Sequence, residues 1–181
     1  MDKYFRFSCK PVLTGFAATL LTFAAFPSPA NAALVVNGIT YNQPAVDQTY
    51  ATEIVGDNTV GTYNQAGGTN TVTNGLWLGY RVGGSGFYNL SGISVGGTSA
   101  LVALYEYIGN YGPGVFTQIG GTNTVTNYIS LGVTPTITGS YDLSGGILSS
   151  SSIILGDQGI GTFTHSGGTN NVRGIKLVVH A

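Results

Sequence analysis

The sequence is poor in charge, and this shortage excludes two classes of protein. Only 7% of its 181 residues are charged, against roughly a quarter in typical domains. A disordered, solvated tail needs a high net charge, and a nucleic-acid-binding face needs clustered Lys and Arg. The chain has neither, so it is expected to fold and to bind no nucleic acid.

The N-terminal 32 residues have the three parts of a signal peptide. MDKYFRFSCK carries Lys3, Arg6 and Lys10, and an uncharged stretch of 15 residues follows it, VLTGFAATLLTFAAF. PSPANA then ends in the small-x-small pattern that signal peptidase reads, which predicts cleavage after Ala32. The apolar stretch is shorter than the roughly 20 residues of a membrane-spanning helix. We therefore expect an exported chain, secreted or at the cell surface, with no membrane span after cleavage.

Cysteine is almost absent as well. The single cysteine, Cys9, precedes the apolar stretch, so the exported chain would contain no disulfide and must be stabilised by other contacts. Beyond residue 32 the chain has three basic and six acidic residues, a net charge of −3. This mild charge favours no particular partner.

Glycine is abundant, with 29 residues, and it marks a tandem repeat. The octet GGTNTVTN occurs at 67–74 and again at 120–127, and a shorter copy, GGTNNV, follows at 167–172. Five segments share one order of markers: an apolar residue plus Gly, then Gly-x-aromatic, then a Gly-rich turn. The first markers, at residues 55, 78, 108, 131 and 155, lie 23, 30, 23 and 24 residues apart. The longer step predicts an insertion at 96–104.

The pieces between the glycines predict strands. They are four to six residues long, rich in Thr, Val, Ile, Tyr and Phe, and show no helical period. Three short strands joined by glycine turns in each repeat are typical of a β-solenoid. We therefore predict an all-β parallel β-helix of about five coils over 53–181. Residues 33–52, which include Pro44, are expected to form an N-terminal strand or cap segment.

The repeat also predicts a core. One aromatic residue recurs in each segment and is expected to point inward as a stacked ladder: Tyr63, Tyr88, Phe116, Tyr141 and Phe163. The residues two positions later share that face: Gln65, Leu90, Gln118, Leu143 and His165. Structural glycines are expected at the turns: Gly67, Gly68, Gly120, Gly121, Gly145, Gly146, Gly167 and Gly168.

The octet itself is interpreted as a turn followed by the third strand of a coil. Val72 and Val125 are expected to point inward, while Thr and Asn could bond along the stack. Alternate segments replace the octet with GISVGGTS and GGILSSSS. The octets lie 53 residues apart, so the true period is expected to be a pair of coils.

These repeats resemble those of bacterial exported β-helix proteins. The stretches GTFTHSGGTN, GSYDLSGG and GVFTQIGGTNTVTN are similar to the repeats of autotransporter passenger domains and of surface proteins of the PEP-CTERM type. The likeness covers about 53–172, without the membrane barrel of the first group or the sorting tail of the second. It implies a surface-exposed parallel β-helix, often structural or adhesive, and does not specify an activity.

The acidic residues offer little support for catalysis. Asp57 and Asp157 fall in matching spacers four coils apart, while Glu53 and Glu106 match two coils apart. Glycoside hydrolysis needs two converging carboxylates, and lyases of this fold class use Asp clusters that bind Ca²⁺. We interpret these residues as solvated turn acids. No catalytic, metal-binding or cofactor-binding residue is predicted, and no cofactor; a polysaccharide-active enzyme is a less favoured alternative.

Two further motifs have structural explanations. His165 occupies the slot that holds Gln65 and Gln118 in other segments, and His180 lies in the terminal strand. The Thr-x-Thr-x-Thr runs at 69–73 and 122–126 resemble ice-binding ranks, but alternate coils are expected to interrupt them. Ice binding is therefore a second less favoured alternative.

The main functional alternative is binding of surface polysaccharide. Aromatic residues outside the ladder could line a groove beside the insertion, although they could equally cap the core: Trp77, Tyr80, Tyr105, Tyr107 and Tyr111. The leading hypothesis remains a non-enzymatic structural or adhesive protein of the cell surface or matrix.

The ends of the solenoid predict self-association. The C-terminal strand GIKLVVHA is apolar and has no helix to cover its edge, so it could pair with the first coil of a second copy. Leu177 and Val179 are the residues expected to matter most for this assembly into rods or filaments.

Overall fold

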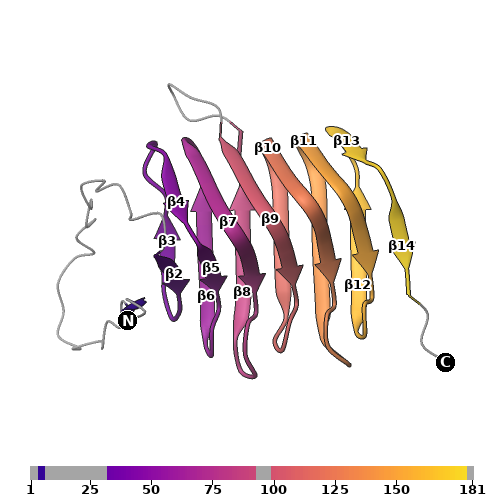
Figure 1. Ribbon diagram of the computed structural model, residues 1–181, viewed down its shortest axis with the longest axis horizontal. Helices are drawn as coiled ribbons and strands as arrows, with labels where there is room; N and C mark the ends of the chain where they lie inside the picture. Colours follow the sequence, from indigo (N-terminus) through magenta and orange to yellow (C-terminus); the bar gives the residue numbers. More distant parts are fainter. Residues whose placement is uncertain (1–3, 7–31, 93–98, 179–181) are drawn as a thin grey trace.

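The chain winds into a parallel β-solenoid whose coils lie side by side along one axis (Figure 1). The computed structural model describes residues 4–6, 32–92 and 99–178. Every strand pairing in this part of the chain is parallel. The predicted fold class is therefore confirmed. The predicted signal peptide, with Cys9, falls almost wholly outside the described residues.

Each coil contributes one strand segment to each of three faces. The first face consists of β2 (Ala33–Val36), β5 (Thr52–Val55), the C-terminal parts of β7 (Thr69–Leu78), β9 (Ala100–Ile108), β10 (Gly114–Leu131) and β11 (Thr138–Leu155), and β14 (Ile175–Leu177). The second face consists of β3 (Thr40–Asn42), β6 (Val60–Gln65), β8 (Ser85–Leu90), the N-terminal parts of β10 and β11, and β12 (Ile160–His165). The third face consists of β4 (Gln48–Tyr50), the N-terminal parts of β7 and β9, the middle of β10 and β11, and β13 (Thr169–Val172).

Six coils follow from these pairings, and we number them in chain order. Coils 1 to 6 span residues 33–50, 52–72, 76–103, 105–125, 128–150 and 152–172, and β14 begins a further turn. The short strand β1 (Tyr4–Arg6) pairs with β2 at the N-terminal edge. Residues 33–52, for which a strand or a cap segment was expected, contain strands β2, β3 and β4, which pair in register with coil 2 and make up a further coil.

The predicted insertion is also too long. Ala100–Ala103 pair with Thr69–Val72 of coil 2, so the first residues of β9 are the counterpart of the octet strand. The expectation that 96–104 is inserted is therefore wrong for residues 100–104, and GISVGGTS is not the counterpart of the octet. Residues 96–98 of the predicted insertion lie outside the described residues.

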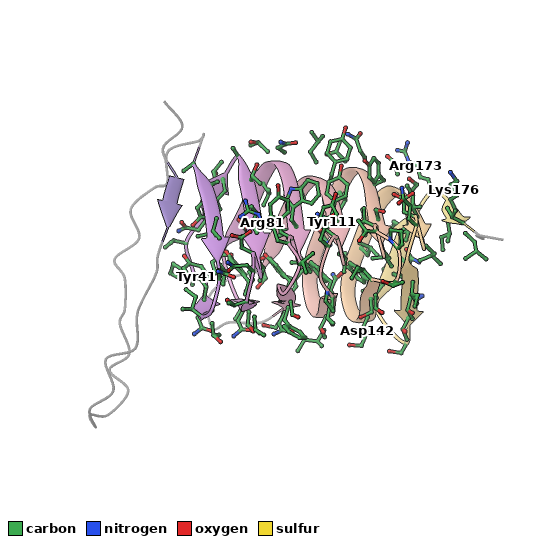
Figure 2. All side chains as sticks on the ribbon, turned by 90° about the horizontal axis from the view of Figure 1, so that it is seen from below. Tyr41, Arg81, Tyr111, Asp142, Arg173 and Lys176 are labelled. Atoms are coloured by element: carbon green, nitrogen blue, oxygen red, sulfur yellow. The ribbon has the colours of Figure 1, made fainter. Side chains whose placement is uncertain are left out.

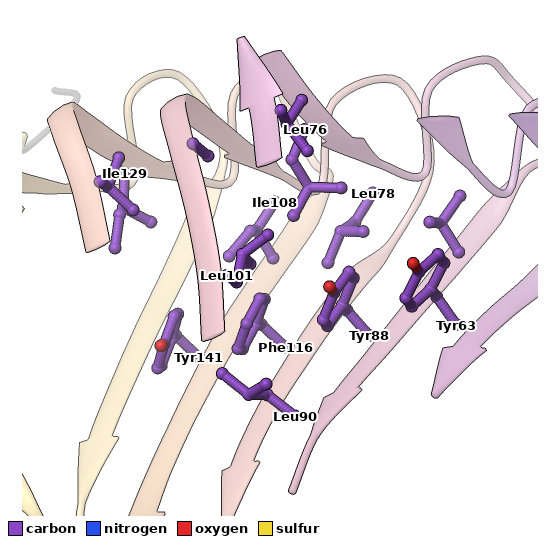
Figure 3. Close-up of a cluster of buried hydrophobic side chains, with 14 of the residues drawn as sticks. Tyr63, Leu76, Leu78, Tyr88, Leu90, Leu101, Ile108, Phe116, Ile129 and Tyr141 are labelled. Carbon is purple, nitrogen blue, oxygen red and sulfur yellow. The ribbon is translucent and has the colours of Figure 1, made fainter. Parts of the chain in front are cut away.

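Inward side chains of the second face form a continuous stack of rings (Figure 3). Tyr63, Tyr88, Phe116 and Tyr141 are each 0% exposed. Neighbouring ring centroids in this stack lie 4.6–4.9 Å apart, and the ring planes differ by only 5–9°. The separation matches the strand spacing of a sheet, roughly 4.8 Å, so the rings stack because the strands do. Phe163, in the last coil, is only partly buried.

Glycine pairs turn the corner between the second and third faces. The second member of each pair has a positive φ, between 68° and 81°: Gly68, Gly121, Gly146 and Gly168. The first members, Gly67, Gly120, Gly145 and Gly167, lie at the same corners. A Cβ on Gly120 would approach the Gly92 nitrogen to 2.4 Å, and one on Gly68 would approach the Val46 carbonyl oxygen to 2.6 Å. Neighbouring coils therefore touch through their backbones here.

Removal of one ring from the stack should destabilise the whole solenoid. We expect Phe116→Ala to lower the free energy of unfolding by about 3–5 kcal/mol, because the ring contacts Tyr88 on one side and Tyr141 on the other. Phe87→Ala is the matched control, since Phe87 points outward and is 37% exposed; its cost should stay below about 1 kcal/mol. Urea unfolding followed by circular dichroism measures both, and equal losses would contradict the inward placement of the stack.

Candidate functional site

Two groups of buried polar side chains, which we call the polar layers, cross the interior. The first layer consists of Glu53, Gln65, Asn70 and Tyr88, and the second of Glu106, Gln118, Asn123 and Tyr141. All eight side chains are 0% exposed. Each member of the second layer follows its counterpart by 53 residues, which is the spacing of the two octets.

Hydrogen bonds connect the first layer from end to end. The Asn70 side-chain nitrogen donates to Glu53 Oε2 at 2.7 Å and to the Tyr88 hydroxyl oxygen at 3.1 Å. The Tyr88 hydroxyl donates to Gln65 Oε1 at 2.7 Å. Gln65 Nε2 in turn donates to the backbone carbonyls of Gly68 and Ala100, at 3.0 and 2.8 Å. The chain of bonds thus joins coil 2 to coil 3.

The second layer repeats these bonds between coils 4 and 5. Asn123 donates to Glu106 Oε1 at 2.9 Å and to the Tyr141 hydroxyl at 3.0 Å. The Tyr141 hydroxyl donates to Gln118 Oε1 at 2.5 Å, and Gln118 Nε2 donates to two backbone carbonyls. The recurrence of GGTNTVTN is therefore explained by an inward asparagine as well as by the turn. The valine of each octet also points inward, as predicted, and is at most 2% exposed.

The interpretation of Glu53 and Glu106 as solvated turn acids is wrong. Both carboxyl groups lie in the interior, with Leu76 between them in register on the first face. Sequence reasoning matched the two glutamates with each other, but it did not compare them with the Gln, Asn and Tyr residues that recur at the same spacing. The signal that could have found them is the shared 53-residue spacing of Glu, Gln, Asn and Tyr.

Protonation of these glutamates would give every buried oxygen of Glu53, Asn70, Glu106 and Asn123 a hydrogen-bond partner. Glu53 Oε1, Asn70 Oδ1, Glu106 Oε2 and Asn123 Oδ1 are buried and have no hydrogen-bond partner among the described residues. A neutral carboxylic acid can donate to an amide oxygen while it accepts from the amide nitrogen, so one proton would satisfy two of these atoms. Burial raises the pKa of Glu53 and of Glu106 from the ordinary 4.5 to about 8, although the asparagine donors lower it.

Whether a stacked ring is tyrosine or phenylalanine depends on one residue in the preceding coil. That residue lies two positions after the ring of the preceding coil. Tyr63, Tyr88 and Tyr141 donate to Gln43, Gln65 and Gln118, at 2.9, 2.7 and 2.5 Å. Phe116 and Phe163 instead follow Leu90 and Leu143. Glutamine is thus always followed by tyrosine and leucine by phenylalanine. The rule avoids an unpaired hydroxyl in the core.

On the outer side of the first face, five aromatic side chains form one group, which we call the ring cluster: Trp77, Tyr80, Tyr105, Tyr107 and Tyr128. All five are half-buried. The Trp77 and Tyr107 rings stack, with centroids 3.9 Å apart and planes 11° apart. Tyr80 packs edge-on against Trp77 at 5.4 Å. The sequence predicted four members of this cluster and missed Tyr128.

Tyr128 connects the remaining members of the ring cluster through its hydroxyl group and its ring. The hydroxyl oxygens of Tyr107 and Tyr128 lie 2.9 Å apart, and the Tyr105 ring centroid lies 4.8 Å from that of Tyr128. Burial, together with the hydrogen bond to Tyr128, raises the pKa of Tyr107, so its hydroxyl is neutral. Gly75 leaves room for the indole, because a Cβ there would lie 2.9 Å from Trp77 Nε1.

The fifth predicted residue, Tyr111, does not join the cluster. It is 54% exposed in the turn after β9, and no ring contact among the described residues connects it to the other five. The cluster packs on the outside of the sheet and so does not cap the end of the core. Two charged residues lie near the cluster: Arg81, which lies over Tyr80 at 5.5 Å and also pairs with Asp57 at 3.3 Å, and Asp157, whose carboxylate helps to raise the pKa of Tyr107.

The structure does not bring the other residues considered for catalysis or ligand binding together into one site. Asp57 and Asp157 follow β5 and β11, in coils 2 and 6, so the structure does not bring them together. His165 is exposed in coil 6, and His180 lies outside the described residues. Thr71 and Thr124 have Val102 between them in register, so the threonine ranks are interrupted, as predicted.

The surface has few other features that suggest a ligand. An open depression near the first two coils has no ionisable lining: Gly38, Ile39, Thr40, Thr59, Val60 and Thr62. Across the described ranges, no group of three His, Cys, Asp or Glu side chains could hold a metal ion. In the same residues, no helix is long and apolar enough to cross a membrane. Comparison with protein-family models, curated proteins and solved structures finds no match.

The buried glutamates predict a stability that falls as the pH rises. Below pH 4.5 each glutamate carboxyl is protonated in the folded and in the unfolded chain. Between pH 4.5 and 8 each carboxyl loses its proton in the unfolded chain but keeps it in the folded chain. The free energy of unfolding should therefore be highest in acid and decrease across this window, by up to about 1.4 kcal/mol per pH unit for each glutamate. Urea unfolding at pH 5, 6, 7 and 8 measures the slope.

The double variant Glu53→Gln with Glu106→Gln should remove this slope. A glutamine amide can make both hydrogen bonds to asparagine without a proton that titrates. Asp142→Asn, on the outer side of β11, is the matched control and should leave the slope unchanged. A wild-type stability that does not change between pH 5 and 8 would show that the glutamates are not held neutral.

Proposed function

We propose that the chain is an exported, non-enzymatic β-solenoid that adheres to extended polysaccharide through the ring cluster. The observation that carries this proposal is the packing of five aromatic side chains into one outward group on the first face. Sugar rings present C–H groups that pack against aromatic faces, and sugar hydroxyls pair with tyrosine hydroxyls. The ring cluster offers both kinds of contact.

The form of the cluster favours a polymer over a small molecule. Small ligands are usually bound in concave pockets, whereas this cluster extends across neighbouring strands of one face. Arg81 beside the cluster is already paired with Asp57, and the Asp157 carboxylate acts on Tyr107, so the charge near the rings is not positive. A neutral, extended polysaccharide therefore suits it better than an acidic one.

Export is supported by the N-terminal signal-peptide pattern and by the resemblance of the repeats to those of exported β-helix proteins. A solenoid that holds its core by stacked rings and buried hydrogen bonds needs no disulfide, which suits a chain with no cysteine beyond Cys9. In this role the coils provide a rigid support, and the first face provides the contact surface.

Adhesion should depend on the ring cluster and not on aromatic residues in general. In pull-downs on microcrystalline cellulose and chitin, and on a glycan array, Trp77→Ala and Tyr107→Ala should each weaken binding roughly fivefold to tenfold. Tyr111→Ala is the matched control, because Tyr111 is exposed but separate from the cluster. A blank array and no retention on either polymer by the folded wild-type protein would remove the proposal.

Export is tested separately. Expression of the whole chain in a bacterium that has a general secretion system should yield a protein whose first residue is Ala33, as measured by mass spectrometry of the extracellular and surface fractions. Recovery of the chain only in the cytoplasm, with residues 1–32 still attached, would contradict it.

A further inference from the structure

Two tyrosines of the ring cluster meet through their hydroxyl groups. The hydroxyl oxygens of Tyr107, in coil 4, and Tyr128, in coil 5, lie 2.9 Å apart. Their ring centroids are 5.8 Å apart, and the ring planes differ by 89°. Because each hydroxyl is flanked by two ring carbons, which we call the ortho carbons, this contact brings the ortho carbons of the two rings close together.

The pair is open to small reagents, unlike the tyrosines of the inner stack. Tyr107 and Tyr128 lie on the outer side of the first face and are half-buried. The stacked tyrosines are each 0% exposed, and each donates its hydroxyl proton to a buried glutamine: Tyr63, Tyr88 and Tyr141. A small oxidant can therefore reach the outer pair while the core stays closed.

The sheet holds the two outer rings together. Tyr128 is the register partner of Tyr105, and its ring also reaches the diagonal neighbour Tyr107. The register partner of Tyr107 is Ser130, which is small and leaves the space beside Tyr107 to the Tyr128 ring. Trp77 stacks on Tyr107 from coil 3, at 3.9 Å. Rings confined in this way react with each other before they can react with a distant partner.

We propose that Tyr107 and Tyr128 are a modification site, at which a peroxidase with hydrogen peroxide joins the two rings as dityrosine. Each tyrosine loses one electron and its phenolic proton and becomes a phenoxyl radical, whose unpaired electron lies partly on the ortho carbons. One ortho carbon of each ring forms the new C–C bond. Both coupled carbons then lose their protons and both oxygens regain one. One hydrogen peroxide molecule accepts the two electrons and two protons and becomes two water molecules.

The surroundings of the pair suit this oxidation. Burial and the hydrogen bond to Tyr128 raise the pKa of Tyr107, so its hydroxyl is protonated and must release a proton when the ring is oxidised. The contact between the two hydroxyls gives the donated proton an acceptor. The Asp157 carboxylate lies near enough to act on Tyr107, and its negative charge favours removal of an electron from the ring.

The new bond closes one coil as a covalent ring. Tyr107 and Tyr128 are 21 residues apart, and the chain between them passes once around the solenoid. A cross-link of this kind stabilises a fold mainly because it restricts the unfolded chain, as a disulfide does. The chain has no cysteine beyond Cys9 with which to form a disulfide. The inference does not depend on the binding of polysaccharide.

Treatment of the folded full chain with a haem peroxidase and hydrogen peroxide tests the site. The protein is kept dilute, so that coupling within one chain is favoured over coupling between chains. We expect dityrosine fluorescence from a monomer whose mass is lower by that of two hydrogen atoms. Protease digestion and mass spectrometry should identify one cross-linked pair of peptides, which contain Tyr107 and Tyr128. Wild-type protein unfolded in urea should not give this pair as its main product.

Phenylalanine variants identify the partners, because phenylalanine keeps the ring but has no hydroxyl to oxidise. Tyr107→Phe and Tyr128→Phe should each abolish dityrosine within one chain, whereas Tyr105→Phe should retain it. Tyr111→Phe is the matched control: Tyr111, labelled in Figure 2, is 54% exposed and has no ring contact with the cluster among the described residues. The urea midpoint of the treated wild type should rise, and that of treated Tyr128→Phe should not.

Four results would overturn the inference: no dityrosine in monomers of the folded wild type, dityrosine that persists in Tyr107→Phe, a cross-link that maps to Tyr105 or Tyr111, or a cross-linked chain whose urea midpoint does not rise. Circular dichroism of each variant before treatment separates a lost cross-link from lost folding. Binding of polysaccharide is measured on the untreated protein, so failure of the cross-link and failure of adhesion are distinguishable.

Discussion

Everything in this solenoid depends on the parallel stacking of like positions, about one strand spacing apart. An inward side chain in one coil has its main contacts with the side chains at the same and nearby positions in the coils before and after it. A ring must therefore meet a ring, and a buried hydroxyl must meet an acceptor in a neighbouring coil. The stack of Tyr63, Tyr88, Phe116 and Tyr141 and the polar layers are two results of this one constraint.

The constraint also decides how much could be read from the sequence. Glycine and aromatic markers recur in coils 2 to 6, so they predicted the fold class, the three strands per coil and the inward ladder. The first coil escaped prediction because its strands are short and the turn between its second and third strands, at 45–47, contains no glycine. Tyr128 escaped because membership of the ring cluster depends on which residues share an outer face, and a register shift between Val125 and Tyr128 sets this.

Polar residues in the interior were harder to recognise. A glutamate side chain usually lies at the solvent-exposed surface, and a single Glu in a strand gives no reason to expect that it is buried. Its burial is explained only by a partner 17 residues away, Asn70 for Glu53 and Asn123 for Glu106, and the chain brings these partners together by completing a coil. Physical reasoning from one residue at a time therefore could not find the layers, whereas comparison of the two octets and their surroundings could.

The 53-residue repeat of the polar layers has a consequence for the history of the chain. Loss of coil 3 alone would bring Gln65 beside Phe116 and leave the glutamine without its hydroxyl donor. Loss of coils 3 and 4 together would bring Gln65 beside Tyr141 and keep the pairing intact. From coil 3 onward, duplication and deletion should therefore be tolerated in units of two coils, so that relatives that vary in this part would differ by even numbers of turns.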